Sequence, residues 1–336
     1  MLRWRGLAEG APDWNRTVVT IGVFDGVHRG HRALIDATVR AADALLPVPR
    51  PSGTEPRTAP PVVVVTFDPH PAAVLRPEAA PDRLTTLDHR AVLIEGLAAD
   101  GLTVDGLCTL PFTPELARLS PAEFVRTVLV DHLRAAAVVV GEGFRFGYRA
   151  EGDVALLRTF GAEHGFEVRT VPLLTDAGGV VSSSRIRADV TEGEMERAAA
   201  ALGRPHRVEG MVVRGDQRGR ELGFPTANLS SPAFTSVPAD GVYAGWLVRD
   251  PARHAGDREL PLPAAISIGT NPTFAGERAR RVEAYILDFD ADIYDETVAV
   301  DFAARLRPTV AFTSVDALIT QMDADVARVR ELLLGG

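Results

Sequence analysis

The first half of the chain alternates apolar runs of strand length with longer amphipathic segments. The apolar runs cover residues 18–24, 61–71, 104–112, 135–147 and 166–174. Segments with helical periodicity follow them, at residues 31–46, 85–101, 120–133 and 153–165. Because strands joined by helices run parallel in one sheet, this alternation predicts a doubly wound α/β domain.

The pattern changes in the second half, where short strand-like segments are separated by Gly, Pro and Asp clusters. These segments cover residues 206–215, 241–249, 263–270, 281–289 and 296–308. An amphipathic helix is predicted at residues 314–333. The pattern is typical of a small antiparallel β-barrel with a terminal helix. We therefore predict one domain over residues 1–188, a helical linker over 189–204 and a second domain over 205–336.

A proline-rich segment interrupts the first half at residues 47–61, "PVPRPSGTEPRTAPP". Proline at this density is incompatible with either a helix or a central strand. We expect a mobile surface insertion at this point.

Composition excludes several classes of protein. A chain of 336 residues is long enough for two domains, and its single cysteine, Cys108, rules out an internal disulfide framework. The N-terminus lacks the apolar core of a signal peptide, and no apolar run approaches the roughly 20 residues of a membrane span. We therefore expect a cytoplasmic protein without a membrane partner. A net charge of −9 argues against a broad nucleic-acid surface.

All the fixed cationic side chains are arginines, because the sequence contains no lysine. Any phosphate site must therefore use arginine, histidine, backbone N–H groups or a metal ion.

The segment "VTIGVFDGVHRGHRALI", residues 19–35, places glycines and histidines on a predicted strand-to-helix turn. Such a turn presents backbone N–H groups and a helix N-terminus, which suit an anionic ligand. If the helix begins near Val27, His28 and His31 project from one face of its first turn. Two alternatives remain open: a glycine turn with a surface cap, or a histidine metal pair, for which only Asp25 is near in sequence.

The ordered string Gly-x-Phe-Asp-Gly-x-His-x-Gly-His is more specific than either alternative. It resembles the HxGH nucleotidyltransferase superfamily, in which this turn holds ATP for adenylyl transfer.

Two further segments are candidates for the same site. "TFDPHP", residues 66–71, stands at the carboxyl end of the second strand, although we interpret His70 as part of a turn imposed by its neighbouring prolines. "VSSSRIR", residues 181–187, places three hydroxyls before two arginines at a predicted helix start. An N-cap needs only one serine, so the run favours phosphate binding.

The second half carries a different set of polar residues. In an extended segment Thr226 and Asn228 point to the same side, so a hydroxyl and an amide could together hold Mg²⁺ and a nucleotide phosphate. The alternative is a proline-containing turn with a Thr/Asn cap. Glu283 shares its predicted strand face with Tyr285 and Leu287, which makes it a candidate general base. The alternative for Glu283 is a charge on an edge strand.

Together, "GRELGFPTANL", "SIGTNPTF" and "VEAYILDFDADIYDETVAVDFAARLRP" resemble the riboflavin kinase barrel. With the N-terminal motifs, residues 16–333 are similar to the prokaryotic bifunctional riboflavin kinase/FAD synthetases. The resemblance implies that the C-terminal domain phosphorylates riboflavin to FMN. It implies that the N-terminal domain adenylylates FMN to FAD and releases pyrophosphate, with ATP, riboflavin and FMN as the partners.

The resemblance also implies the site residues. Glu283 would be the kinase base, and His28 and His31 would act in adenylyl transfer. Thr226 and Asn228 would hold Mg²⁺ with the ATP phosphates. The ATP site of the adenylyltransferase would comprise Gly22, Phe24, Asp25, Gly30, Ser182, Ser183, Ser184, Arg185 and Arg187. The ATP and flavin site of the kinase would comprise Gly215, Gly219, Arg220, Gly223, Pro225, Thr226, Asn228 and Asn271.

Three positions depart from the family pattern. Ser184 stands where threonine is common, Gly143 replaces an Asp or Asn of the adenylylation site, and Asp295 follows Tyr294 where glycine is usual. Two other functions stay open: an enzyme of the same superfamily with another acceptor, and a non-catalytic flavin-binding module. The sequence leaves the oligomeric state open between a monomer and transient self-association.

Overall fold

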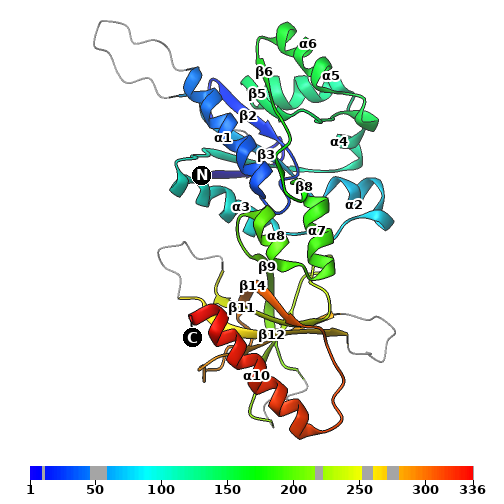
Figure 1. Cartoon of the computed structure of the whole chain (residues 1–336). Coiled ribbons are helices and arrows are strands. Elements are labelled where there is room, and N and C mark those ends of the chain that lie inside the picture. The colour runs from blue at the N-terminus through cyan, green and yellow to red at the C-terminus, as the bar shows by residue number, and fades with distance from the viewer. Residues whose placement is uncertain (10–11, 46–58, 216–221, 252–259, 271–279, 336) are drawn as a thin grey trace, which may run out of the picture. The chain divides into compact units, whose positions relative to one another are not determined.

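The structure is a computed structural model that describes residues 1–9, 12–45, 59–215, 222–251, 260–270 and 280–335 (Figure 1). Most of the proline-rich segment 47–61, together with Gly219, Arg220 and Asn271, lies outside the described residues. The chain divides into two compact units. The first holds Met1–Pro81 and Arg90–Val181, and the second holds Asp82–His89 and Ser182–Gly336. The functional domain limits expected at residues 188 and 204 stay a prediction.

The first unit contains a six-stranded sheet in the order β1-β4-β3-β2-β5-β6, and each of its strand pairs is parallel. Its strands are β1 Leu2–Arg5, β2 Thr17–Ile21, β3 Val62–Asp68, β4 Gly106–Pro111, β5 Ala135–Gly141 and β6 Glu167–Val171. The predicted doubly wound α/β fold is confirmed. The sequence pattern missed β1, a short edge strand in which only Trp4 is buried.

Alternate residues of the central strands separate the core into two layers. Val18 and Val64 belong to the cluster that includes Ile35 of α1, whereas Val19 and Val63 belong to the cluster on the opposite face. The helices are α1 Arg29–Ala44, α2 Pro71–Leu75, α3 Leu87–Gly96, α4 Pro114–Arg118, α5 Pro121–Phe124 and α6 Val154–His164. The remaining helical segments are the 3₁₀ turns η1 Pro77–Ala79, η2 Leu97–Asp100 and η4 Tyr148–Ala150, and the π-helix η3 Val125–His132.

The order of the strands determines where a ligand can enter. From β2 the chain adds β3 and β4 on one side, and it then returns to place β5 and β6 on the other side. The carboxyl ends of β2 and β5 therefore form the topological switch point, the usual ligand-binding crevice of such sheets.

The second unit contains a closed barrel in the order β10-β13-β12-β11-β14-β9, with antiparallel pairing throughout. Its strands are β9 His206–Val213, β10 Thr226–Ser230, β11 Gly241–Arg249, β12 Leu262–Thr270, β13 Arg280–Ile286 and β14 Thr297–Arg307. Helix α10, Val315–Leu334, packs against β11 and β12. The predicted barrel with a terminal helix is confirmed.

Three further segments belong to the second unit. Helices α7 Ser183–Glu192 and α8 Met195–Leu202 pack together, and α8 also packs on β14 and β9. Asp82–His89 joins the barrel although it lies far away in sequence. The Arg83 backbone N–H donates to the carbonyl of Phe234 at 2.6 Å, and the Thr86 hydroxyl donates to Glu209 at 2.6 Å. A short hairpin of β7 Thr175–Asp176 and β8 Gly179–Val180 completes the first unit.

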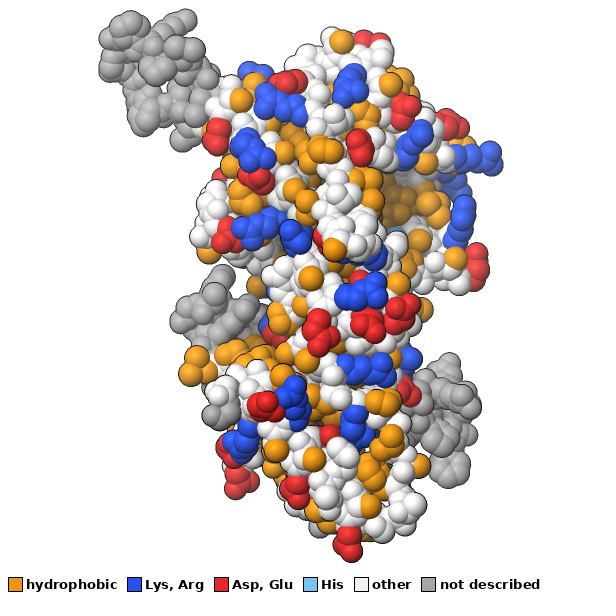
Figure 2. All heavy atoms as spheres, viewed as in Figure 1, with side chains coloured by type: hydrophobic (Ala, Val, Ile, Leu, Met, Phe, Trp, Pro, Cys, Tyr) orange, Lys and Arg blue, Asp and Glu red, His pale blue; other side chains and the backbone are white. Residues whose placement is uncertain are grey.

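Acidic and basic side chains are interspersed over the face of the molecule drawn in Figure 2. Within the described ranges, no helix combines the length and apolar character that crossing a bilayer requires.

Candidate active sites

After the turn that follows β2, helix α1 begins two residues later than the predicted start near Val27. Helix α1 starts at Arg29, with His28 as the N-cap, because Val27 has a positive φ of 39° and His28 is extended. His28 Nδ1 accepts a hydrogen bond from the backbone N–H of His31 at 3.3 Å. The two imidazole rings stack with centroids 3.6 Å apart, so both histidines lie on one face of the turn, as predicted.

The turn is tightly packed and conformationally strained. Phe24 is fully buried at a φ of 53°, a conformation that costs free energy in residues other than glycine. A Cβ on Gly30 would lie 3.1 Å from ring atoms of His28 and 3.4 Å from the carbonyl oxygen of Val181. Gly30 therefore permits the histidine to pack against the backbone.

Asp25 does not present its carboxylate to solvent. The residue is 1% exposed, and its Oδ1 lies 3.8 Å from Nη2 of Arg90 on α3. Within the described part of the chain, no group of three His, Cys, Asp or Glu side chains could hold a metal ion. The alternative of a histidine metal pair at this turn thus gains no third ligand there.

A cavity of about 1110 Å³ opens at the carboxyl ends of the central strands. Gly22 and Gly143, which follow β2 and β5, both line it, as expected for the switch point. Its walls carry the aromatic side chains of Phe67, Phe112, Phe124, Phe144, Phe146 and Tyr148. Such walls suit a planar ligand.

The same cavity is lined by four arginines, Arg76, Arg118, Arg145 and Arg149. Figure 2 shows a hollow with hydrophobic walls and basic side chains along its rim in the upper right of the view. The sequence motifs include Gly22 and Gly143 of this cavity but none of its aromatic walls other than Phe67 and none of its arginines. The signal was present in residues 143–150, "GFRFGYRA", where aromatic residues alternate with arginine or glycine.

The segment 66–71 contributes to the turn through Thr66 rather than His70. His70 caps α2, accepting a hydrogen bond from the backbone N–H of Ala72 at 3.1 Å, so its interpretation as a turn residue is confirmed. The Thr66 hydroxyl donates to the carbonyl of Val23 at 2.8 Å. The ends of β2 and β3 are therefore joined at this point.

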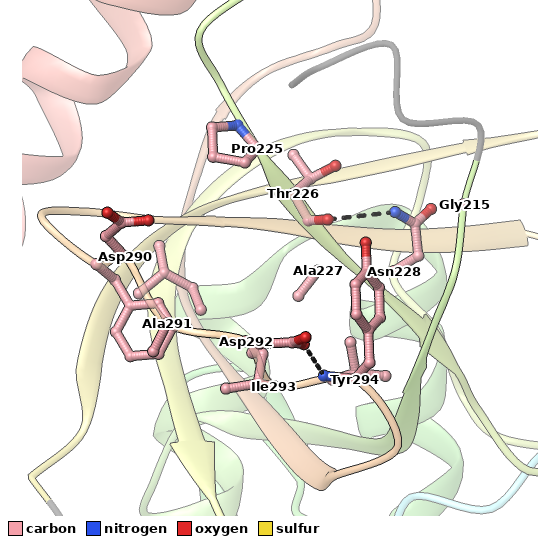
Figure 3. Close-up of a pocket in the computed structure, with 13 residues that line it drawn as sticks. Gly215, Pro225, Thr226, Ala227, Asn228, Asp290, Ala291, Asp292, Ile293 and Tyr294 are labelled. Carbon is pink, nitrogen blue, oxygen red and sulfur yellow. Dashed lines mark hydrogen bonds between the residues drawn. The ribbon is translucent and has the colours of Figure 1, made fainter. Parts of the chain in front are cut away.

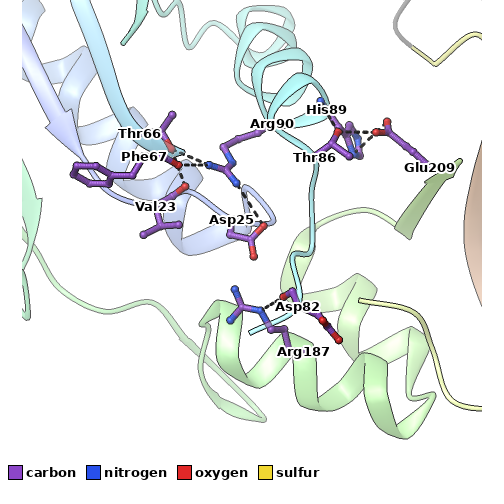
Figure 4. Close-up of polar contacts among 10 residues, drawn as sticks. All are labelled: Val23, Asp25, Thr66, Phe67, Asp82, Thr86, His89, Arg90, Arg187 and Glu209. Carbon is purple, nitrogen blue, oxygen red and sulfur yellow. Dashed lines mark hydrogen bonds and ion pairs between the residues drawn. The ribbon is translucent and has the colours of Figure 1, made fainter. Parts of the chain in front are cut away.

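The serine-arginine segment begins α7, as predicted, with Ser182 as its N-cap. The Ser182 hydroxyl accepts from the backbone N–H of Arg185 at 3.3 Å. Arg187 donates through Nε to the carbonyl of Asp82 at 2.7 Å, also within the second unit (Figure 4). Nε of Arg185 lies 4.0 Å from Oδ2 of Asp189. The pKa of Asp189 is raised, because the effect of burial exceeds the opposite effect of Arg197 and Arg185.

In the barrel, the register aligns the predicted kinase residues on one face. Thr226 and Asn228 point to the same side of β10, as predicted, and Asn228 pairs with Glu283 of β13. Glu283 in turn pairs with Ser267 of β12. Because β13 has neighbours on both sides, the interpretation of Glu283 as an edge-strand charge is wrong.

The predicted face of Glu283 is also present. Tyr285 and Leu287 both belong to it, because they pack in one cluster with Val329 of α10, although β13 itself ends at Ile286. The backbone N–H of Leu287 donates to the carbonyl of Pro263 at 2.9 Å, which continues the pairing with β12.

Two cavities of the barrel share Thr226. The first, of about 330 Å³, is lined by Thr226, Asn228, Gly215 and Tyr294 among others (Figure 3). A Cβ on Gly215 would lie 2.6 Å from the carboxamide of Asn228, so this position requires glycine for close approach. Pro225 lines the same cavity, and Gly223 adopts a φ of 86° in the preceding turn.

The second cavity, of about 280 Å³, contains Glu283 and Thr226. Phe224 and Tyr285, whose rings lie 5.2 Å apart, form part of its apolar wall. Glu283 therefore stands in a largely apolar cavity, next to the residue that both cavities share.

The departures from the family pattern have local explanations in two cases. Asp295 has a φ of 63°, the left-handed conformation that glycine adopts most easily, so the turn keeps its shape. A Cβ on Gly143 would meet no atom within 4 Å, so the cavity has room for a larger side chain there.

Comparison with known proteins matches both halves of the chain. The FAD synthetase family model matches residues 11–185, and the riboflavin kinase family model matches residues 202–333. A bifunctional riboflavin kinase/FMN adenylyltransferase of Pseudomonas fluorescens is 36% identical over 98% of this chain and 96% of its own length. The protein of the same description from Escherichia coli K12 is 36% identical over 94% of this chain and 92% of its own length.

A solved structure is similar over nearly the whole chain. The crystal structure of a protein from Streptococcus pneumoniae, described as a macrolide-efflux protein, superposes with a TM-score of 0.81 and 32% identity. The match covers 98% of this chain and 99% of that one.

Proposed function

Because the chain belongs to the family of bifunctional riboflavin kinase/FMN adenylyltransferases, we propose that it makes FAD from riboflavin in two ATP-dependent reactions. The second unit phosphorylates riboflavin to FMN. The first unit then transfers an adenylyl group to FMN. The observation that carries the proposal is the pair of barrel cavities that meet at Thr226, with Glu283 beside it.

The two barrel cavities suit two different substrates. The apolar cavity with Phe224 and Tyr285 accommodates the riboflavin ring, and the cavity with Gly215 and Tyr294 accommodates ATP. Their common border then brings the ribityl hydroxyl and the γ-phosphate together. Glu283 accepts the hydroxyl proton as the oxygen attacks the phosphorus and the bond to the β-phosphate oxygen breaks.

Mg²⁺ fits the donors at that border. Thr226 and Asn228 supply a hydroxyl and an amide oxygen on one strand face, and Mg²⁺ commonly takes only one or two protein ligands beside phosphates and water. When bound with ATP, the ion would neutralise charge on the phosphates. Gly219, Arg220 and Asn271 are proposed to bind ATP or flavin in the kinase on the motif match alone.

In the first unit, the nucleotide turn is proposed to bind ATP. Backbone N–H groups after Gly22 and at the start of α1 would face an anion at a helix N-terminus, and the stacked His28 and His31 would stabilise negative charge on the leaving phosphates. Gly22, Phe24 and Gly30 set the shape of the turn. The residues Ser182, Ser183, Ser184, Arg185 and Arg187, which belong to the second unit, are proposed as phosphate ligands on their motif match alone.

The aromatic cavity is proposed as the FMN site. Its aromatic walls suit the flavin ring, and its arginines suit the FMN phosphate. An oxygen of that phosphate attacks the α-phosphorus of ATP, the bond to the β-phosphate oxygen breaks, and pyrophosphate leaves. The attacking phosphate is already anionic, so this step requires no general base.

The proposed substrates also bear on the location and the partners of the protein. Because both reactions use ATP, the proposed location is the cytoplasm, and the proposal includes no nucleic-acid or membrane partner.

Product chromatography tests the proposal. Incubation of the protein with riboflavin, ATP and Mg²⁺ is expected to give FMN first and FAD later, with ADP from the first step and pyrophosphate from the second. FMN without FAD would contradict the adenylyltransferase assignment. Bound but unchanged riboflavin would favour the non-catalytic flavin-binding module, and adenylylation of phosphopantetheine or nicotinamide mononucleotide alone would favour another acceptor.

A further inference from the structure

Arg90, on the first full turn of α3, is a buried cation that the motifs do not include. The residue is 4% exposed. Its Nη1 donates to the Thr66 hydroxyl at 2.9 Å and to the carbonyl of Phe67 at 3.4 Å. Its Nη2 lies 3.8 Å from Oδ1 of Asp25 (Figure 4). A single guanidinium therefore contacts both the nucleotide turn and the end of β3.

These contacts form a continuous connection. The Thr66 hydroxyl accepts from Arg90 and donates to the carbonyl of Val23, one residue after Gly22. Asp25 lies on the same turn, three residues before His28. Arg90 thus holds the turn at two points, through Thr66 and through Asp25. A buried guanidinium with several partners has little freedom to move, so it holds the turn in a fixed position against the end of β3.

The charge at this position matters as much as the geometry. Asp25 is a buried carboxylate in a turn that, according to the proposed function, must accept the polyanionic triphosphate of ATP. An uncompensated carboxylate there would repel the phosphates in a medium of low dielectric constant. The guanidinium of Arg90 supplies the opposite charge from within the protein interior.

We propose that Arg90 is a positioning residue for adenylyl transfer, which neutralises Asp25 and fixes the nucleotide turn against the end of β3. It acts through Asp25, Thr66 and the backbone of Val23, and it touches neither ATP nor FMN. The inference rests on the proposed adenylyltransferase function. It also gives Asp25 a different role from phosphate binding, because its carboxylate faces an internal cation.

Arginine is required for this role rather than a cation in general. The guanidinium places two nitrogens in a fixed plane, one toward Thr66 and Phe67 and the other toward Asp25. A lysine ammonium is a point charge on a flexible stem, and it would satisfy one side only. Arg90→Lys therefore keeps the charge and loses the bridge.

The test uses the full-length chain with Arg90→Gln, Arg90→Lys and the double variant Asp25→Asn/Arg90→Gln. FMN-to-FAD kinetics are measured over a range of ATP concentrations. Arg90→Gln is expected to raise the KM for ATP about 10- to 100-fold, the effect of leaving a buried charge without its partner. Arg90→Lys is expected to raise it several-fold. The double variant is expected to have a KM for ATP closer to the parent value than that of Arg90→Gln, because it removes the uncompensated charge.

Two controls separate this role from a general effect on folding. Riboflavin-to-FMN activity of the same samples reports on the second unit, and near-ultraviolet circular dichroism reports on packing. Arg3→Gln removes another ion pair of α3, in which Arg3 lies 2.8 Å from Glu95, away from the turn. Its KM for ATP in adenylylation is expected to stay at the parent value.

The inference is overturned if Arg90→Gln keeps the parent KM for ATP, or if the double variant is no better than Arg90→Gln. If Arg90→Gln does not fold, Arg90→Lys decides instead, and a parent-like KM for ATP in that variant overturns the bridging role. Failure of the proposed function looks different, because the unmodified protein itself would then make no FAD.

Discussion

The two proposed phosphate sites are built in different ways. In the nucleotide turn, the groups that would face ATP are backbone N–H groups and two stacked imidazoles, held by a strained, buried turn. In the barrel, the corresponding groups are side chains of Thr226, Asn228 and Glu283, which project from hydrogen-bonded strands. The barrel strands keep their ladder whatever these side chains are, whereas the turn depends on its own side chains for its shape.

Chemistry and structure are therefore separable to different degrees in the two units. A side chain on the outer face of the barrel can be changed without altering the scaffold beneath it. In the turn, the Phe24 ring lies 5.0 Å from the His31 ring, and Gly30 lies directly against the His28 ring. One substitution there therefore disturbs both the shape and the chemistry.

Glu283→Gln tests whether barrel chemistry can be removed alone. The substitution keeps the volume of the side chain and removes the proposed base. Riboflavin phosphorylation is expected to slow by roughly 10²- to 10⁴-fold, the usual contribution of general base catalysis. FAD synthesis from added FMN is expected to continue at the parent rate, and the melting temperature to change little. Steady-state kinetics of each reaction measure these effects.

A matched control for Glu283 is Asp288→Asn, an exposed acid just beyond β13 that pairs with Arg330. Its kinase rate is expected to equal that of the parent. Equal slowing of both reactions by Glu283→Gln would show that the two sites are not independent.

His28→Ala and His31→Ala test the turn. Each is expected to lower FMN-to-FAD turnover by about 10²- to 10³-fold, because each removes a group that stabilises developing negative charge. Riboflavin-to-FMN conversion is expected to stay intact. His28→Ala also loses the helix cap, so its free energy of unfolding is expected to be about 1 kcal/mol lower than that of His31→Ala. Full FAD synthesis by both variants would refute the assignment of the histidines.

Gly30→Ala tests whether the shape of the turn matters by itself. The added methyl group would press against the His28 ring at 3.1 Å, so His28 must shift. We expect adenylylation to fall by about 10-fold, in line with the cost of a misplaced catalytic group. Gly96→Ala, on α3, is the matched control because its new methyl group meets nothing within 4 Å. Similar adenylylation rates for the two variants would show that the turn tolerates a shift of His28.

Gly143→Asp is expected to have the smallest effect. The side chain would enter open space in the aromatic cavity, where the family pattern has an Asp or Asn. If it restores one polar contact to ATP, the KM for ATP in adenylylation is expected to fall a few-fold, as for one hydrogen bond of about 1 kcal/mol. The KM for ATP of the kinase should not change. An unchanged value in adenylylation would indicate that backbone or water already fills that role.

The sequence determined the fold class, the order of the two domains and the chemistry of their motifs. Alternation of apolar runs and helical periodicity is a local property, so it identified the parallel sheet, and the two-residue spacing of Thr226 and Asn228 correctly placed both on one side of a strand. The motif strings carried the resemblance to the family because they specify residue types at fixed spacing. The sequence pattern did not predict short elements such as β1 and α2, because they are too short to show a clear periodicity.

Which distant residues meet depends on the folded arrangement of the chain. The alignment of Asn228, Glu283 and Ser267 depends on the register of three strands, which no local pattern specifies. The aromatic cavity draws its walls from segments between Gly22 and Ala150. The contact between Arg90 and Asp25 and the attachment of Asp82–His89 to the barrel join residues far apart in sequence. Burial and long-range pairing are properties of the folded chain, and that is why the sequence alone could not supply them.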